Sequence, residues 1–352
     1  MSTSKKWRVF TLLTTLLLVF STFSSAVIAA PSSAPAVDVS FTILHTNDFH
    51  GQLEYQSGGS TSNPGSARLA AVVNGVRTAV GAGNVLVMDA GDEMQGSLLS
   101  NIWKGVPVID VYNIIGYDAA TFGNHEFDWG QADLGARMTQ ATFPFLSANI
   151  TLKDGGGNCT WTPYGDAAWQ VFTVGTAPNT VDVGVIGVTS TETPYITIAA
   201  ATAGLCFRDP YEAIVQHYAA LDAASDVIVV LSHIGYADGG YGYGFPVYGD
   251  QTLASKLNTA GKPVNLIIGG HSHTDVTTPA VVGNTVVTPA HYNGRKVGRA
   301  DFTVNPDGTV GIVWSKISVT NASAEDAAIK ALIATYTSDP AYQATISAPV
   351  GY

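Results

Sequence analysis

Five short apolar stretches of this chain each lead into a polar cluster that offers metal-binding or acid–base side chains. Apolar runs of this length are typical of strands in the interior of an α/β protein. The carboxyl ends of parallel strands meet at one edge of a sheet, where open α/β proteins place their functional sites. The runs and their clusters are Val39–His45 with Asp48 and His50, Val85–Met88 with Asp92, Ala119–Phe122 with Asn124, His125 and Asp128, Val227–Leu231 with His233, and Val264–Ile268 with His271 and His273.

The densest of these clusters is Gly123–Asp128, which contains an amide, an imidazole and two carboxylates. Taken alone, it could be a polar turn, just as an Asp after a strand is often only a helix cap and a single His-x-His is often a surface turn. Five such strand ends in one chain are hard to obtain by chance, and they hold five of its eight histidines. We therefore expect one shared site, although the sequence suggests no role for Glu126.

The side chains in the five clusters are mainly imidazoles and carboxylates. Such mixed nitrogen and oxygen ligands suit divalent transition metals. Two ions held about 3.5–4 Å apart clamp a phosphoryl group and lower the pKa of a bound water to give a hydroxide nucleophile. The pair needs a bridging carboxylate with small neighbours, and Asp92, which follows Gly91, meets that need. The sequence therefore predicts two divalent metal ions as cofactors.

Strands and helices alternate along most of the chain, and strand pairs are added late. This order predicts an α/β sandwich with mixed sheets rather than a barrel. The apolar spacing predicts helices over Ala67–Ala79, Val106–Ile115, Asp209–Asp222 and Ala324–Tyr336, and another that begins near Gln131. Further strands are expected at Phe145–Ile150, Trp169–Val174, Val181–Thr189, Val281–Val282, Thr285–Thr288, Val297–Val304 and Val310–Ile317.

The first 29 residues have the three parts of a secretory signal peptide. A basic start is followed by an apolar stretch at Val9–Phe23 and by small residues near Ala29. A retained membrane anchor is the alternative, but the apolar run is short for a span. We expect cleavage, no stable membrane span afterwards, and a secreted, periplasmic or extracellular protein. Residues 30–37 form a Pro/Ser/Ala linker.

Charge and cysteine content narrow the class of protein further. The chain is 46% hydrophobic, with a net charge of −11, and loss of the three basic residues of the signal takes it to −14. A nucleic-acid polymer is therefore not an expected partner. The two cysteines, Cys159 and Cys206, would form one disulfide in an oxidising compartment. Two buried free thiols are the alternative.

Five segments resemble motifs of the calcineurin-like metallophosphoesterases, and more closely those of the secreted bacterial-type 5′-nucleotidase branch. The resemblance spans about Phe41 to Val304 and implies a four-layer αββα sandwich, which we assign to residues 38–320. Residues 321–352 resemble the start of an interdomain linker, so the second, substrate-binding domain of that branch would be absent. The motifs are Ile43–Gly51, Gly91–Ser97, Gly123–Asp128, Ser232–Gly235 and Gly270–His273.

The resemblance also implies a role for each site residue. His125 would act on the leaving group or on the transition-state charge, with Asp128 orienting its ring. The metal could be zinc, manganese or a similar ion. By the resemblance, one ion would be held by Asp48, His50, Asp92 and His273, and the other by Asp92, Asn124, His233 and His271.

Substrate contacts are expected first from Asn124 and His125. Tyr241 and Tyr243, in a Gly/Tyr-rich loop, could stack on a nucleobase, or the loop could simply be ordered surface. His291 could contact substrate, or be a turn residue.

The resemblance implies a small-molecule phosphoester, most simply a nucleotide, as the substrate of a 5′-nucleotidase-like hydrolase. A broad phosphomonoesterase and a 2′,3′-cyclic nucleotide phosphodiesterase are the enzymatic alternatives. A metal-binding scaffold domain that needs a partner chain is the non-enzymatic one. The presence of Asp92, Asn124 and His125 argues against a scaffold. The sequence does not indicate an oligomeric state.

Overall fold

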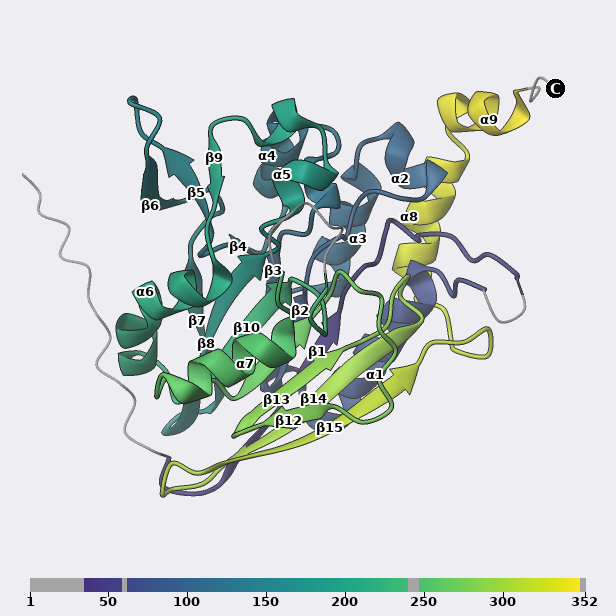
Figure 1. The fold of residues 1–352 in the computed structure, drawn as a ribbon. Helices are drawn as coiled ribbons and strands as arrows, with labels where there is room; N and C mark the ends of the chain where they lie inside the picture. The colour runs from purple at the N-terminus through teal and green to yellow at the C-terminus, as the bar shows by residue number, and fades with distance from the viewer. Residues whose placement is uncertain (1–34, 59–61, 240–246, 349–352) are drawn as a thin grey trace, which may run out of the picture.

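Two six-stranded sheets form the centre of the computed structural model, which describes residues 35–58, 62–239 and 247–348 (Figure 1). The first sheet has the order β15–β14–β1–β2–β3–β4, comprising β1 (Val39–Thr46), β2 (Val85–Asp89), β3 (Ala119–Thr121), β4 (Phe145–Leu146), β14 (Lys296–Val304) and β15 (Val310–Ser318). The second has the order β12–β13–β11–β10–β8–β7, comprising β7 (Trp169–Thr176), β8 (Asn179–Thr189), β10 (Val227–His233), β11 (Leu266–Gly269), β12 (Ala280–Val282) and β13 (Thr285–Pro289).

A small third sheet and the helices complete the fold. The third sheet has the order β6–β5–β9, comprising β5 (Ile150–Lys153), β6 (Cys159–Pro163) and β9 (Leu205–Phe207). The α-helices are α1 (Ser66–Val80), α2 (Leu98–Ile102), α3 (Val106–Ile115), α4 (Gln131–Gln140), α5 (Thr193–Ile196), α6 (Pro210–Ala223), α7 (Asp250–Thr259), α8 (Ala327–Thr337) and α9 (Pro340–Ser347). Short 3₁₀ turns are η2 (Ala82–Asn84), η3 (His125–Phe127) and η4 (Ala199–Thr202).

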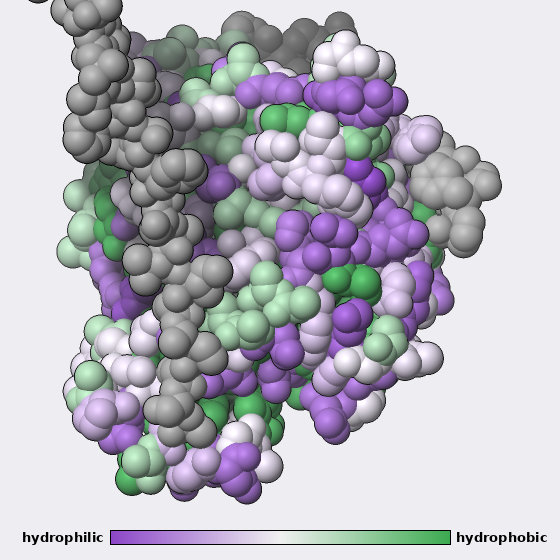
Figure 2. All heavy atoms as spheres, turned by 90° about the vertical axis from the view of Figure 1, so that its left-hand side faces the viewer, coloured by the Kyte–Doolittle hydropathy of each residue, from purple (hydrophilic) through white to green (hydrophobic). Residues whose placement is uncertain are grey.

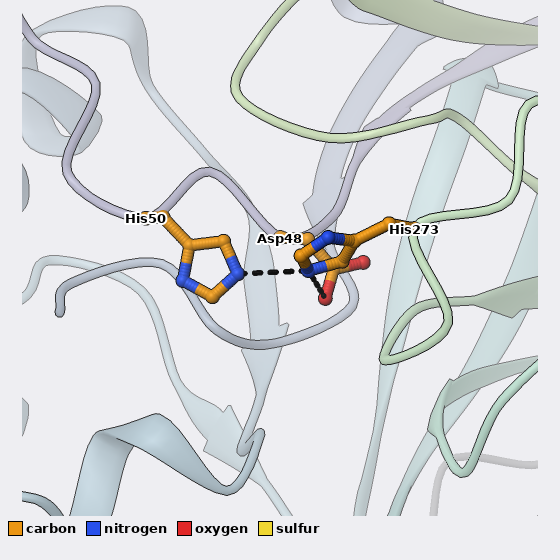
Figure 3. Close-up of side chains that lie close together, drawn as sticks. All are labelled: Asp48, His50 and His273. Carbon is orange, nitrogen blue, oxygen red and sulfur yellow. Dashed lines mark hydrogen bonds and ion pairs between the residues drawn. The ribbon is translucent and has the colours of Figure 1, made fainter. Parts of the chain in front are cut away.

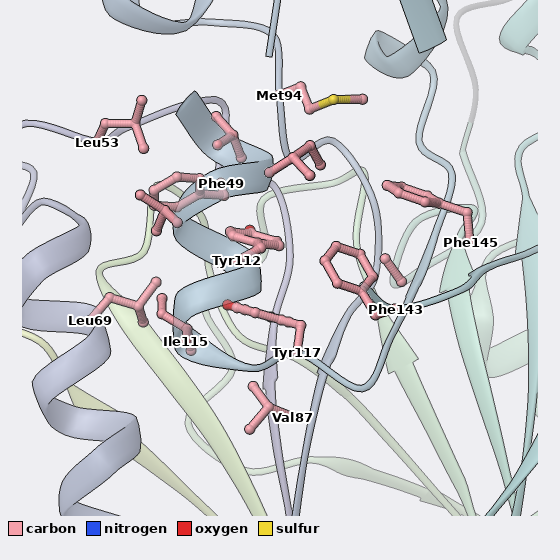
Figure 4. Packing of buried hydrophobic residues seen from close by; sticks show 14 of the residues in the cluster. Phe49, Leu53, Leu69, Val87, Met94, Tyr112, Ile115, Tyr117, Phe143 and Phe145 are labelled. Carbon is pink, nitrogen blue, oxygen red and sulfur yellow. The ribbon is translucent and has the colours of Figure 1, made fainter. Parts of the chain in front are cut away.

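The alternation of side chains along each strand produces the layers. In β1, Ile43 faces the core between the two large sheets, whereas Leu44 faces the core under α1 and α3. In β10, Val229 faces the same central core and Val230 the core under α6 and α7. The expected four-layer αββα sandwich is confirmed. Figure 4 shows part of the outer core, where Tyr112 and Tyr117 stack with ring centroids 3.9 Å apart.

The register of the paired strands determines where along the sheet edge the loops of the site begin. Strands β1 and β2 are parallel and pair Thr46 with Asp89, their last residues. The loops that contain Asp48 and Asp92 therefore leave the sheet at the same level. Parallel pairing of β10 with β11 places Ser232 opposite Gly269 in the second sheet, with the same result.

The expected strand over Phe145–Ile150 was wrong in extent. The chain turns at Ser147, whose hydroxyl accepts a hydrogen bond from the Ile150 main chain at 3.1 Å. Strand β4 therefore ends at Leu146, and β5 starts at Ile150 in a different sheet. Four of the six residues in this stretch are apolar, and its composition gives no clear warning of such a turn. Helix α7 and the small third sheet were also not anticipated.

A disulfide and an ion pair each connect distant parts of the chain. Cys159 and Cys206 form a disulfide that joins β6 to β9 in the small sheet. Arg68, at the start of α1, forms a 2.9 Å ion pair with Glu325, just before α8. Helix α8, expected to resemble a linker, buries Ile329 in the same core as α1 and α3. This helix is therefore packed against the sandwich.

The molecular surface carries polar and apolar residues side by side on the face shown in Figure 2. Within the described residues, no helix combines the length and the apolarity that crossing a bilayer requires. The proposed signal segment, residues 1–29, lies outside the described residues.

Candidate metal centre

The five predicted polar clusters converge at the carboxyl edge of the two large sheets. Main-chain hydrogen bonds fasten the loops to one another: the His50 N–H donates to the Asp92 carbonyl at 2.9 Å, and the His271 N–H donates to Asp48 Oδ1 at 3.0 Å. The structure brings together every predicted ligand: Asp48 and His50 after β1, Asp92 after β2, Asn124 after β3, His233 at the end of β10, and His271 and His273 after β11.

One group of possible metal ligands comprises Asp48, His50 and His273 (Figure 3). His50 Nε2 lies 2.9 Å from His273 Nε2, and His273 Nε2 lies 3.4 Å from Asp48 Oδ1. One donor atom from each residue lies within 4.8 Å of the others. This spacing allows one ion to contact all three.

A second group comprises Asp92, His233 and His271. His233 Nε2 lies 3.1 Å from Asp92 Oδ2, and the same oxygen lies 4.0 Å from His50 Nε2 in the first group. Asp92 therefore faces both groups, as a bridging ligand must. Asn124 Oδ1 is buried without a hydrogen-bond partner among the described residues, which makes it available as an oxygen ligand.

The histidine tautomers suit metal binding. His50 Nδ1 lies 3.0 Å from the Gln95 carbonyl oxygen, and His233 Nδ1 lies 2.7 Å from that of Ala90. A carbonyl oxygen only accepts, so each Nδ1 carries the proton. The lone pair of the neutral ring is then on Nε2, which points to the centre. Metal-ligating histidines are commonly fixed in this way.

The electrostatics of the site favour a cation. Burial lowers the pKa of His233, but the Asp92 and Asp48 carboxylates outweigh it and raise that pKa to about 10. Burial alone would raise the pKa of Asp92, yet His233, His50 and His125 hold it well below the usual range. Burial, together with His233, instead lowers the pKa of His271 to about 4, so that ring is a neutral donor. The imidazole and carboxylate donors of the pocket fit a divalent transition metal.

The backbone of the site adopts conformations that side-chain-bearing residues rarely use. Asp48, His50, Asp92, His271 and His273 all have positive φ, between 50° and 72°. Such residues cost about 1–3 kcal/mol each and cluster at functional sites. A single left-handed residue turns the chain sharply, which lets short loops direct their side chains into one centre.

His125 and Asp128 form the predicted pair beside the metal groups. His125 Nδ1 lies 2.7 Å from Asp128 Oδ2, and this hydrogen bond raises the pKa of His125 to about 9 against the opposing effect of burial. Thr197, which the sequence did not indicate, donates to Asp128 Oδ1 at 3.2 Å. The ring is thus oriented with Nε2 left for a substrate, 5.4 Å from the His50 ring between centroids.

Glu126, to which we assigned no role, holds two site loops together. Its carboxylate is 1% exposed and accepts hydrogen bonds from the main-chain N–H groups of Asp92, Gly123 and Glu93 at 2.8, 2.7 and 3.0 Å. Gly123 allows this close approach, because a Cβ atom there would collide with the Asp92 carboxylate. The only sequence signal for this role is the position of Glu126 between His125 and Asp128.

A second carboxylate missed in the sequence is Glu192, which follows β8. It is 1% exposed, and its Oε2 lies 4.0 Å from His271 Nε2.

The residues predicted to contact substrate are only partly described. His291 lies beside the centre, with Nδ1 3.4 Å from the His273 carbonyl oxygen. The neighbouring Tyr292 stacks on the His273 ring with centroids 4.7 Å apart. Tyr241 and Tyr243 lie outside the described residues.

Fold and site together define a metal-dependent phosphoester hydrolase. The family model for calcineurin-like phosphoesterases matches residues 41–275. The chain belongs to the calcineurin-like phosphoesterase family. These enzymes use two divalent metal ions, and the two groups of donors described above provide for two.

Relatives narrow the comparison to 5′-nucleotidases. The chain is 34% identical over 242 residues to the 5′-nucleotidase of Bos taurus, covering 66% of this chain and 38% of that protein. It is 32% identical over 300 residues to protein UshA of Salmonella pullorum, covering 79% and 52%. Among solved structures, a 5′-nucleotidase precursor from Thermus thermophilus matches with a TM-score of 0.68 and 29% identity, covering 85% and 58%. The chain thus spans about half the length of these relatives.

Proposed function

We propose that this chain is an exported 5′-nucleotidase that releases phosphate from nucleoside 5′-monophosphates. The observation that carries the proposal is the position of Asp92, which faces both donor groups next to an imidazole oriented by Asp128. We infer a nucleotide as the substrate from the names of the relatives. Under this proposal, Asp48, His50, Asp92 and His273 would hold one ion, and Asp92, Asn124, His233 and His271 would hold the other.

The chain's own residues bind and orient the phosphoryl group. When bound, two divalent ions supply an acidified water and charge stabilisation for phosphoryl oxygens. Asn124 and His125 lie in the turn after β3, where the His125 N–H donates to Asp92 Oδ1 at 2.8 Å and the His125 ring lies 5.4 Å from that of His50 between centroids, so they border the donor groups. His125 is protonated below a pKa of about 9 and can donate from Nε2 to a phosphoryl or leaving oxygen. Asp128 keeps the ring in place, as an orienting carboxylate does for a general acid.

Export is supported by two features at different points of the chain. Residues 1–29 have the composition of a signal peptide. The disulfide between Cys159 and Cys206 is of the kind that persists in oxidising compartments. We place the catalytic domain at residues 38–320, after a linker at 30–37.

A comparison of three substrates tests the proposal. The full chain without residues 1–29 is assayed with manganese or zinc against AMP, a 2′,3′-cyclic nucleotide and p-nitrophenyl phosphate, with Asp92→Ala as control. We expect metal-dependent release of phosphate from AMP, and its loss in the variant. Turnover of the aryl ester alone contradicts the nucleotide assignment, and turnover of the cyclic nucleotide alone favours a phosphodiesterase. Turnover of none of them favours the scaffold.

A further inference from the structure

A groove of about 580 Å³ opens beside the metal centre on the side of His273. The side chains in it that bear charge or can acquire one are Asp275, His291, Arg295 and Lys296. They come from the loop after β11 and from the segment that enters β14.

The segment with the basic residues is fastened to the metal centre. Asn47 Nδ2 donates to the His291 carbonyl at 2.5 Å, and the Asn293 N–H donates to the Asp48 carbonyl at 2.7 Å. The positions of Arg295 and Lys296 are therefore set by the same loop that carries Asp48. A rigid link of this kind is what a subsite for another part of the substrate requires.

Both cations of the groove donate hydrogen bonds to neighbouring side chains. Arg295 donates from Nε and Nη2 to Asn63 Oδ1 at 3.2 and 3.0 Å, and Lys296 Nζ donates to Ser318 Oγ at 2.7 Å. The acid of the groove, Asp275, is paired with Lys316. Among the side chains that line the groove, the two cations Arg295 and Lys296 outnumber the one carboxylate, in a chain whose net charge is −11. The groove therefore favours an anion.

Tyr292 lies between His273 of the metal centre and Arg295 of the groove. The His273 ring stacks on Tyr292 at 4.7 Å, and the Arg295 guanidinium lies 4.4 Å from the Tyr292 ring centroid. An anion in the groove is thus held by a different set of residues from the scissile phosphate. It needs a spacer, such as a sugar, between the two groups.

We propose that the groove binds a second phosphoryl group of the substrate, joined to the scissile phosphate through a sugar. Arginine forms paired hydrogen bonds with phosphate, and lysine supplies a point charge. The preferred substrate class is then a nucleoside bisphosphate rather than a monophosphate. The choice of a nucleotide as the substrate rests on the proposed function.

Titration with hydrolysis-resistant phosphonates tests the groove without any turnover. Adenosine 5′-phosphonate and adenosine 3′,5′-bisphosphonate are titrated calorimetrically into the manganese-loaded full chain and its variants. Lys296→Met removes the charge, and Lys296→Arg restores it. Lys262→Met is the matched control, because Lys262 lies in the turn after α7, before β11 starts, away from the carboxyl edge.

We expect the bisphosphonate to bind wild type about tenfold more tightly than the monophosphonate, as charge-assisted hydrogen bonds allow. Lys296→Met should abolish this advantage and leave monophosphonate binding within twofold, whereas Lys296→Arg and Lys262→Met should preserve it. Equal affinities in wild type, or an advantage that survives in Lys296→Met, would overturn the proposal. The proposal would also be overturned if the affinity for free inorganic phosphate depended on Lys296 to the same extent, because the groove would then be a site for a free ion. If the advantage depends on Lys296 but the enzyme hydrolyses no nucleotide, only the proposed function fails.

Discussion

The buried carboxylate of Glu126 accepts a 2.8 Å hydrogen bond from the main-chain N–H of Asp92. The same Oε2 atom accepts one from Gly123 at 2.7 Å. Since Asp92 follows β2 and Gly123 follows β3, this one side chain sets the distance between two loops of the metal centre. Asp92 can face both donor groups only while that distance is kept.

Replacement of Glu126 by Gln should therefore weaken metal binding. An amide has one acceptor oxygen, so some of the four main-chain N–H groups, those of Asp92, Glu93, Met94 and Gly123, lose their partner. We expect metal affinity to fall about 10–100-fold and the free energy of unfolding to fall by about 1–3 kcal/mol. Metal titration and urea unfolding measure the two effects. Glu212→Gln, at an exposed position of α6, is the control, and equal metal affinity in both variants would count against the role of Glu126.

Replacement of Asp128 by Asn should move the alkaline limb of the pH–rate profile. The hydrogen bond to Asp128 raises the pKa of His125 to about 9, so the imidazolium persists at neutral pH and is lost as the pH rises through about 9. Without the carboxylate, this pKa returns towards about 6.5. We expect kcat at pH 7.5 to fall about 10–100-fold.

The profile of kcat between pH 6 and 10 checks this shift. Asp133→Asn is a matched control, because Asp133 pairs with Lys104 on the surface. An alkaline limb that stays in place in Asp128→Asn would show that His125 is not the titrating acid.

His45 should make the fold sensitive to acid. It is fully buried in β1, accepts a 3.2 Å hydrogen bond from Trp314, and burial lowers its pKa to about 3. Between about pH 6.5 and 3, the unfolded chain binds a proton at this residue that the folded chain does not. Stability is therefore lost as the pH falls, by about 2 kcal/mol at pH 5.

Urea unfolding of metal-free protein at pH 7.5 and pH 5 measures this loss, with His45→Gln as the non-titrating comparison. The variant should lose about 2 kcal/mol less than wild type between the two pH values. Equal losses would mean that His45 is not held neutral.

The disulfide should stabilise the small sheet. Cys159 and Cys206 are 47 residues apart, and closure of a loop of that length is worth about 4 kcal/mol in the chain-entropy account. The double variant Cys159→Ser/Cys206→Ser should unfold at correspondingly lower urea concentration than the oxidised wild type. A difference of less than about 1 kcal/mol would contradict a stabilising role.

The sequence predicted the site residues that follow apolar strands, because such strands can be recognised from their composition. Val227–Leu231 is continuous and apolar, so His233 could be placed at its end, and the same reasoning located Asp92 and Asn124. These residues were expected to lie close together because the carboxyl ends of parallel strands meet at one edge of the sheet. The pairing of Thr46 with Asp89 realises that expectation in the structure.

Contacts made through the backbone or across distant loops left no such signal. Glu126 binds main-chain N–H groups, which every residue possesses, so no partner side chain could indicate its role. Thr197 reaches Asp128 from a loop 69 residues away. The turn at Ser147 that separates β4 from β5 interrupts a run whose composition suits a strand.

Titration of activity with metal tests the central claim most directly. Manganese is added in steps to metal-free protein, and phosphate release from AMP is followed as a function of equivalents per chain. Two ions that share Asp92 predict an increase that ends at two equivalents, with no activity in the presence of chelator. Full activity at one equivalent, or activity that persists without metal, would contradict a dinuclear centre.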